Sequence, residues 1–288
     1  MIHSLDHVVV AVSDLEAATR DTSALLGRGP AWRGTHPAQG TANSLFHLAN
    51  TYLELLSPEG EGGLGAHVAR VIADRGEGVM ALAFGIDDAP KCATELRARG
   101  LVATDPLEGE GEDGISGAVR RWRSVFLSPE SSRGTALFAI EHLEGELPDS
   151  AVIGAPEAAV AALDHSVVYS QDLDASRGLY GDGLGLRLAL DRSFEERGVR
   201  ILFFRVGGAT LEVGGRLEPG DGADPSQDRF GGLAWQVPDA DRARARLADA
   251  GFDVSEVRDG FKPGTRVCTV RSRTCGVPTL VIEPSSQR

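Results

Sequence analysis

The sequence contains few cysteines, and they form no recognisable pattern. Only Cys92, Cys268 and Cys275 occur in 288 residues, and no two of them have the C-x-x-C spacing. An odd number of widely separated cysteines supports neither a disulfide framework nor a zinc knuckle.

Long apolar runs are also missing. No stretch approaches the roughly 20 apolar residues that a membrane-spanning helix needs. The apolar run nearest the N-terminus, Val8 to Val12, is short and stands between Asp6 and Asp14, which is unlike a signal peptide. We therefore expect a cytoplasmic protein with no membrane partner.

Basic residues are outnumbered, with 29 Lys and Arg against 42 Asp and Glu and a net charge of −13. Such a surface repels phosphates, which argues against a nucleic-acid partner. The one dense basic run, Arg120-Arg121-Trp122-Arg123, would be divided between the two faces of a strand. The expected partner is a small-molecule substrate or ligand, bound by a monomer or homodimer.

What the chain does contain is an internal repeat. Leu5-Asp6-His7 returns as Leu163-Asp164-His165, so position 5 corresponds to 163 with an offset of 158. Further along each half, Leu82-Ala83 returns as Leu233-Ala234 with an offset of 151. Matches of this kind indicate a tandem duplication. We place the join between Glu146 and Ala162, with domains over residues 1–148 and 160–288.

Each half repeats a smaller pattern twice. An apolar strand is followed by a helix that begins at an acidic cap and ends at a glycine, and then by three strands. The sequence therefore predicts an α+β fold of four βαβββ modules, in which each half is a curled mixed sheet with its helices outside. The acidic segment from Glu108 to Gly114 is interpreted as a solvated, mobile insertion.

Several glutamates stand within apolar strands, where an unpaired carboxylate is costly. An edge strand could show a single glutamate to water, but His and Glu recur together. His7 precedes Glu54 by 47 positions, and His165 precedes Glu212 by the same 47. Strand alternation predicts that such side chains face the inside of each curled sheet. The four glutamates concerned are Glu54, Glu141, Glu212 and Glu283.

These features resemble the vicinal oxygen chelate superfamily, which includes glyoxalase I, bleomycin and fosfomycin resistance proteins and extradiol dioxygenases. The resemblance rests on the L-D-H opening strand, the D-L helix start, the L-G helix stop and the L-E strand, and it covers essentially the whole chain. It implies two tandem glyoxalase-like domains. It does not imply one reaction, because the superfamily hosts several chemistries.

The resemblance also implies a cup for a divalent metal ion in each half, with ligands from the first and fourth strands of paired modules. The third ligand position, where a histidine is common, is occupied by Ala81 and Gly232. Each cup would therefore keep one imidazole and two carboxylates, a donor set suited to a hard or borderline divalent ion. The resulting sets are His165, Glu212 and Glu283 in the second half and His7, Glu54 and Glu141 in the first.

The leading functional hypothesis is a small-molecule metalloenzyme with lyase or isomerase chemistry. A metal ion of unknown identity would stabilise an enolate or alkoxide, and a glutamate would move the proton. By analogy with tandem extradiol dioxygenases, the second cup is predicted to work, with Glu212 and Glu283 catalytic. Polar residues of the first half are predicted to bind substrate: Arg33, His36, Asn43 and His47.

Two alternatives remain. The chain could bind a small molecule without metal or turnover, like bleomycin-resistance proteins, and its acidic surface would then suit a cationic ligand. An extradiol dioxygenase is disfavoured, because its iron site uses two histidines and one carboxylate, whereas each cup retains a single histidine.

Overall fold

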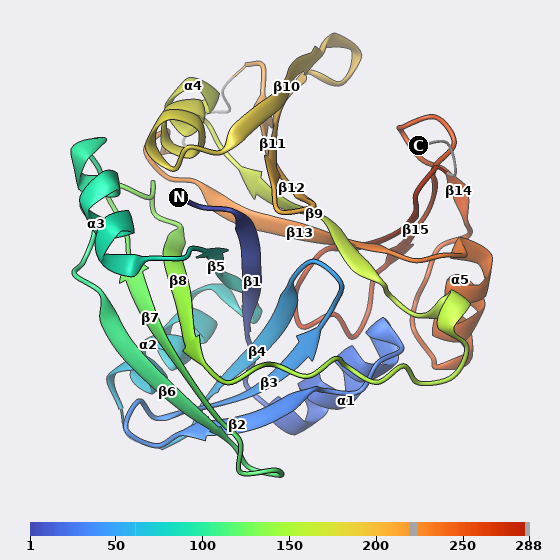
Figure 1. Cartoon of the computed structure of the whole chain (residues 1–288). Coiled ribbons are helices and arrows are strands. Elements are labelled where there is room, and N and C mark those ends of the chain that lie inside the picture. Colours follow the sequence, from blue (N-terminus) through green and yellow to red (C-terminus); the bar gives the residue numbers. More distant parts are fainter. Residues whose placement is uncertain (61, 219–223, 286–288) are drawn as a thin grey trace.

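The protein contains two β-sheets of eight strands each. Figure 1 shows its computed structural model. The structure describes residues 1–60, 62–218 and 224–285. The first half forms a closed barrel and the second an open curled sheet. None of the helices in the described ranges is long and apolar enough to cross a membrane.

The predicted α+β fold of four βαβββ modules is confirmed. The first half contains β1 (Ser4–Ala11), α1 (Leu15–Leu26), β2 (Trp32–His36), β3 (Thr41–His47), β4 (Tyr52–Pro58), α2 (Gly63–Arg75), β5 (Gly78–Gly85), α3 (Ala89–Ala98), β6 (Leu107–Asp113), β7 (Val119–Phe126) and β8 (Ala136–Glu144). Residues 145–161 then lead to the second sheet.

The second half repeats the module order. It contains β9 (Ala162–Tyr169), α4 (Leu173–Arg177) with a π-helical turn over Gly178–Gly183, β10 (Arg187–Phe194), β11 (Val199–Val206), β12 (Ala209–Arg216), β13 (Arg229–Gln236), α5 (Ala240–Asp249), β14 (Arg258–Asp259), β15 (Arg266–Val270) and β16 (Thr279–Glu283). Short 3-10 turns lie at Pro156–Ala158 and Glu195–Arg197.

Local sequence signals explain where the helices begin. Asp14, Asp88 and Asp239 each accept a hydrogen bond from a backbone N–H three residues later, which satisfies one of the free donors of the first turn. Helix α1 ends at Gly27, whose positive φ of 65° is the left-handed conformation that glycine adopts readily. Short-range chemistry therefore sets these ends in both halves.

The first barrel closes where β2 pairs with β6, through Gly34 with Asp113 and Thr35 with Glu112. The strand order around it is β1-β4-β3-β2-β6-β7-β8-β5. In the second half, β10 and β14 occupy the corresponding positions but are the two edges of the sheet. The two halves therefore share a strand order and differ in closure.

The interpretation of Glu108 to Gly114 as a solvated insertion is wrong, because this segment lies within and just after β6 of the barrel wall. Glu108 and Glu110 pair with arginines of β7, and Glu108 also borders the space inside the barrel. A Cβ at Gly109 would collide with the indole of Trp122, so glycine lets that ring lie against the strand. Glu and Gly alternate along this segment with the two-residue period of a β-strand, but its acidic charge favoured the interpretation as a solvated loop.

Helix α2 was not expected from the sequence. It packs on β4, and Leu64 and His67 from it line the inside of the barrel. Its apolar residues Leu64, Val68 and Ile72 recur every four positions, which is the signal of one helix face.

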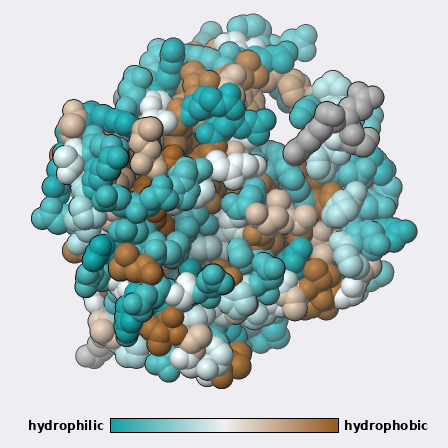
Figure 2. Space-filling view, in the orientation of Figure 1, coloured by the Kyte–Doolittle hydropathy of each residue, from teal (hydrophilic) through white to brown (hydrophobic). Residues whose placement is uncertain are grey.

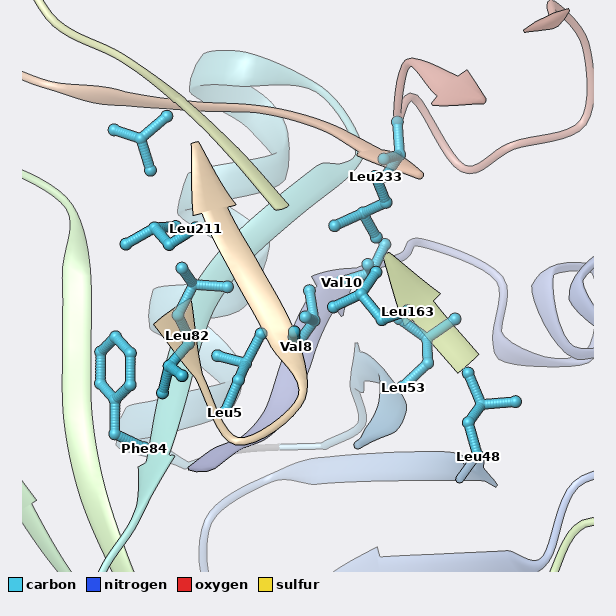
Figure 3. Packing of buried hydrophobic residues seen from close by; sticks show 14 of the residues in the cluster. Leu5, Val8, Val10, Leu48, Leu53, Leu82, Phe84, Leu163, Leu211 and Leu233 are labelled. Carbon is cyan, nitrogen blue, oxygen red and sulfur yellow. The ribbon is translucent and has the colours of Figure 1, made fainter. Parts of the chain in front are cut away.

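The two sheets share one hydrophobic core. Val8 and Val10 of β1 point away from the barrel interior and join the same buried cluster as Leu163, Leu211 and Leu233 of the second half (Figure 3). The outward side of the barrel wall thus packs against the other sheet, and the inward side remains free for a site. Most of the surface seen in Figure 2 is hydrophilic, in keeping with the net charge of −13.

We expect Leu163→Ala to lower the free energy of unfolding by about 2–5 kcal/mol, because Leu163 is fully buried where the sheets meet and its truncation leaves a cavity. Urea unfolding followed by circular dichroism measures this. The matched control is Leu190→Ala, since Leu190 is 47% exposed and should tolerate the change within about 0.5 kcal/mol. Equal effects of the two substitutions would contradict a shared core.

Candidate functional site

A cavity of about 590 Å³ lies inside the N-terminal barrel. Its wall is largely apolar and aromatic, and it includes two of the three tryptophans of the chain, Trp32 and Trp122. On β7, Arg120, Trp122 and Ser124 line the cavity, while Arg121 and Arg123 form ion pairs outside the barrel. The predicted division of the basic run between two faces is therefore confirmed.

Asp6 is the centre of a hydrogen-bonded group at this cavity. The pairing of β1 with β5 has a register shift between Leu5 and His7, so Asp6 lies at an irregularity of the strand. One carboxylate oxygen, Oδ1, is 2.8 Å from Nδ1 of His7, and Oδ2 is 3.0 Å from Nε2 of His142. A single aspartate thus connects two imidazoles from opposite modules.

The carboxyl group of Asp6 is ionised at neutral pH. Burial acts to raise the pKa of this carboxyl, but the hydrogen bonds from His142 and His7, together with their charges, outweigh burial and hold the pKa well below its usual range. An ionised carboxylate only accepts hydrogen bonds, so both imidazoles donate to it. His7 therefore carries its proton on Nδ1 and presents Nε2 to the cavity.

His7 is almost fully buried and is held by packing as well as by Asp6. Its ring stacks on Tyr52 with 4.4 Å between centroids. Its Nε2 lies 3.5 Å from Oε2 of Glu54, and the other oxygen of Glu54 accepts a 2.7 Å hydrogen bond from Nδ2 of Asn43. The predicted pair of His7 and Glu54 is brought together, and Asn43 orients the glutamate.

The predicted substrate-binding residues divide into two groups. Asn43 and His36 line the cavity, and burial lowers the pKa of His36 against the opposing charge of Glu54. Arg33 instead forms an ion pair with Glu16, and His47 lies 3.3 Å from Asp149. The prediction that Arg33 and His47 belong to the site is not supported, because neither lines the cavity.

Arg120, which the sequence analysis named only as part of the basic run, also belongs to the site. The guanidinium of Arg120 lies 5.5 Å from the ring centroid of Tyr52 and 5.8 Å from that of Trp32. Its Nη2 is 3.4 Å from Nδ1 of His142. The alternation of β7 predicts that Arg120 and Trp122 share one face of the strand. It does not predict that this face is the inside of the barrel.

The second half repeats part of this arrangement. His165 Nδ1 lies 2.8 Å from Asp164 and 3.7 Å from Glu212, and Gln236 donates to the other oxygen of Asp164. Burial acts to lower the pKa of His165, but Asp164 and Glu212 outweigh it and raise that pKa. Burial raises the pKa of Glu212. This pair lies on the open sheet rather than in a closed barrel.

The orientation predicted for Glu141 and Glu283 is wrong. Glu141 accepts a hydrogen bond from the backbone N–H of Ala89 at the start of α3, and Glu283 does the same for Ala240 at the start of α5. Both therefore lie on the helix-covered side of their sheets, because a free helix N–H is available there. In the first half, the alternate residues Ile140 and His142 line the cavity instead.

The residues present do not fit the metal cup that the resemblance implies. Ala81 lines the cavity without a donor atom, and any side chain at Gly232 would collide with the carbonyl oxygen of Pro278. With Glu141 turned away, the first cup retains one imidazole nitrogen and one carboxylate, whereas protein metal centres commonly use three or more ligands. In the described ranges, no three His, Cys, Asp or Glu side chains are grouped to hold a metal ion.

Comparison with known families finds two related domains in this chain. The profile of the glyoxalase-like domain matches residues 5–161, and that of the glyoxalase/bleomycin resistance protein/dioxygenase superfamily matches residues 164–269. A comparison with curated protein sequences gives no match.

Solved structures share the fold over the whole chain. A mutant of 4-hydroxymandelate synthase from Streptomyces coelicolor has a TM-score of 0.71 at 16% identity, covering 100% of this chain and 94% of that one. A hypothetical protein from Staphylococcus aureus has a TM-score of 0.66 at 10% identity, covering 99% and 100%. A xylose isomerase-like TIM barrel/4-hydroxyphenylpyruvate dioxygenase fusion protein has a TM-score of 0.65 at 13% identity, covering 100% of this chain and 49% of its own.

The ionised Asp6 predicts a specific pH dependence of stability. A carboxyl whose pKa is lowered on folding stabilises the protein above its unfolded pKa of about 3.9, and this contribution is lost as the pH falls toward the folded value. We therefore expect Asp6→Asn to be less stable than wild type at pH 5, where Asp6 is ionised. The difference from wild type should shrink below about pH 4, as urea unfolding across this range measures. A difference independent of pH would contradict the ionisation of Asp6.

We expect Glu283 to stabilise the N-terminus of helix α5 rather than to bind a metal ion. Glu283→Ala removes the acceptor for the Ala240 N–H and should cost about 0.5–2 kcal/mol of unfolding free energy, as the loss of a cap does. Glu283→Gln keeps an acceptor oxygen and should cost less. Urea unfolding of the two variants tests this, and a larger loss in the glutamine variant would contradict the capping role.

Proposed function

The chain belongs to the glyoxalase-like family, and we propose that its N-terminal barrel is an active site that moves a proton on a small organic molecule. The observation that carries this proposal is His7, which is fixed by Asp6 on one ring nitrogen and presents the other beside Glu54 in an enclosed cavity. Isomerase or lyase chemistry is the reaction class that this arrangement suits.

The His7 and Glu54 side chains supply the proton transfer in this proposal. His7 donates its Nδ1–H to Asp6, so Nε2 has a free lone pair that can accept a proton from a substrate carbon next to a carbonyl. Asp6 stabilises the imidazolium that forms. Glu54, held by Asn43, can share that proton and return it, either to a second position of the substrate or to a departing group.

The enclosure of the site strengthens these interactions. The side chain of His7 is 4% exposed and that of Glu54 is 15% exposed, so little water screens the charges that develop. The largely apolar and aromatic wall offers flat apolar surface to a substrate. No step of this proposal requires a metal ion, because the chain provides the base, its orienting carboxylate and a second acid-base group.

The proposal places the chemistry in the first half, although the tandem layout favoured the second. His165, Asp164 and Glu212 keep the same residue types, but their sheet is open and Glu283 faces α5. The side chains of His165 and Glu212 are largely buried, but the sheet that carries them is open and does not surround a substrate as the closed barrel does.

A binding protein without turnover is the second candidate. It is favoured by the largely apolar wall of the cavity, which is typical of sites that retain a ligand. This candidate differs from the first in one measurable property, since it predicts binding with no exchange of substrate protons.

Deuterium incorporation from D₂O into a panel of small keto acids and aryl acids, followed by NMR, tests the proposal. We expect exchange at a carbon next to a carbonyl, and a reduction of about 10²–10⁴-fold in His7→Gln. Glu54→Gln should also slow exchange, because it removes the second proton-carrying group. His165→Gln in the second half is the matched control and should leave the rate unchanged.

Retention of full activity by His7→Gln, or its loss in His165→Gln alone, would overturn this assignment. Tight binding of panel members without exchange would favour the binding protein.

A further inference from the structure

Arg120 carries a buried positive charge that pairs with no acidic side chain among the described residues. Its residue is 6% exposed, and its Nε is buried without a hydrogen-bond acceptor in the described part of the chain. The neighbouring Arg121 pairs with Glu110 and Glu144, and Arg123 approaches Glu108 and Glu141. Within those same ranges, by contrast, no carboxylate lies within ion-pair distance of the Arg120 guanidinium.

Arg120 reaches a carboxylate only indirectly, because His142 stands between its guanidinium and Asp6. The rings of Trp32 and Tyr52 provide contact with π-electron surface, Tyr52 also forms a side-chain hydrogen bond with Arg120, and His142 accepts one N–H. Asp6 lies beyond His142, and both of its oxygens already accept hydrogen bonds from histidines. A buried guanidinium with an N–H that has no acceptor is costly, so the Nε of Arg120 at the cavity wall, which lacks an acceptor among the described residues, favours a ligand that carries an acceptor with negative charge.

We propose that the ligand of the N-terminal barrel is a monocarboxylate with a flat apolar body, whose carboxylate pairs with Arg120. This rests on the proposed function only in using the same cavity. The planar guanidinium matches the two oxygens of a carboxylate. One buried cation balances one negative charge, and the remaining wall is mostly apolar, which disfavours a multiply charged ligand.

The shape of the cavity agrees with such a ligand. A volume of about 590 Å³ lies within the range of ordinary small-molecule sites. Trp122, Phe126 and Phe138 line it and can contact a flat ring. A cationic group is disfavoured at this subsite, because Arg120 would repel a positive charge placed beside it.

Arg120 also lies close to the residues that would transfer the proton. Tyr52 stacks against His7 on one side and contacts the Arg120 guanidinium through its ring, so the anion subsite and His7 share one wall. A carboxylate held by Arg120 would therefore fix the rest of the ligand beside His7. This gives Arg120 a binding and positioning role.

The test compares 1-naphthoate with 1-naphthamide, which have nearly the same shape and differ in charge. Isothermal titration calorimetry gives the affinities, and tryptophan emission reports occupancy because Trp32 and Trp122 line the cavity. We expect naphthoate to bind wild type at least about tenfold more tightly than naphthamide, as hydrogen bonds to a charged group imply.

Variants test whether the preference for naphthoate over naphthamide depends on Arg120. Arg120→Gln should lose about tenfold or more in naphthoate affinity and bind the two probes alike, while Arg120→Lys keeps part of the preference. Arg121→Gln is the matched control, because it removes the adjacent arginine outside the barrel and should leave both affinities unchanged. If Arg120→Gln does not fold, the wild-type comparison of the two probes and Arg120→Lys decide the question.

Equal binding of naphthoate and naphthamide by wild type would overturn the proposal, as would absence of naphthoate binding at millimolar concentration. Unchanged naphthoate affinity in Arg120→Gln would also overturn it. A separate measurement tests the proposed function: His7→Gln should bind naphthoate as wild type does and lose only proton exchange. Normal exchange in His7→Gln with loss of binding in Arg120→Gln would therefore reject the mechanism and retain the carboxylate subsite.

Discussion

The closure of the first sheet into a barrel is the constraint on which the candidate site depends. Two residue pairs between β2 and β6 complete the ring of strands. Once the ring is closed, the inward side of every strand faces one enclosed space, and residues far apart in the sequence become neighbours. Asp6 and His142, 136 positions apart, form a hydrogen bond at that cavity because β1 and β8 both flank β5.

A closed barrel also changes the electrostatic environment of its polar residues. Inside it, a carboxylate must be paired with hydrogen-bond donors or remain neutral. Asp6 accepts hydrogen bonds from two imidazoles. The bond from Nδ1 of His7 leaves Nε2 as the nitrogen that faces the cavity. The Nε of Arg120 has no acceptor in the described part of the chain, and for that reason Arg120 indicates the charge of a ligand. In this proposal, Asp6 orients His7, and Arg120 selects a ligand with a negative charge.

The comparison of the two halves separates what duplication preserves from what it does not. The Asp-His pair and the matching glutamate recur at Asp164, His165 and Glu212, and the helix-capping glutamate Glu141 recurs as Glu283. Closure does not recur: β6 has seven residues whereas β14 has two, so the second sheet has no strand of similar length with which to complete a ring. Local pairs of residues therefore survive in both halves, while an enclosed cavity is formed by the first barrel.

The sequence by itself determined the four modules, their helix caps and the pairing of His7 with Glu54, because each depends on local periodicity or on a repeated spacing. It also indicated that neighbours in Arg120–Arg123 alternate between faces. Only the tertiary structure decided which face is the inside. Glu141 and Glu283 have the right residue type and the right strand, yet they cap helices, because alternation fixes relative orientation and leaves the absolute direction to packing. The same holds for Arg120, which became a candidate ligand-binding residue only when closure of the barrel buried it.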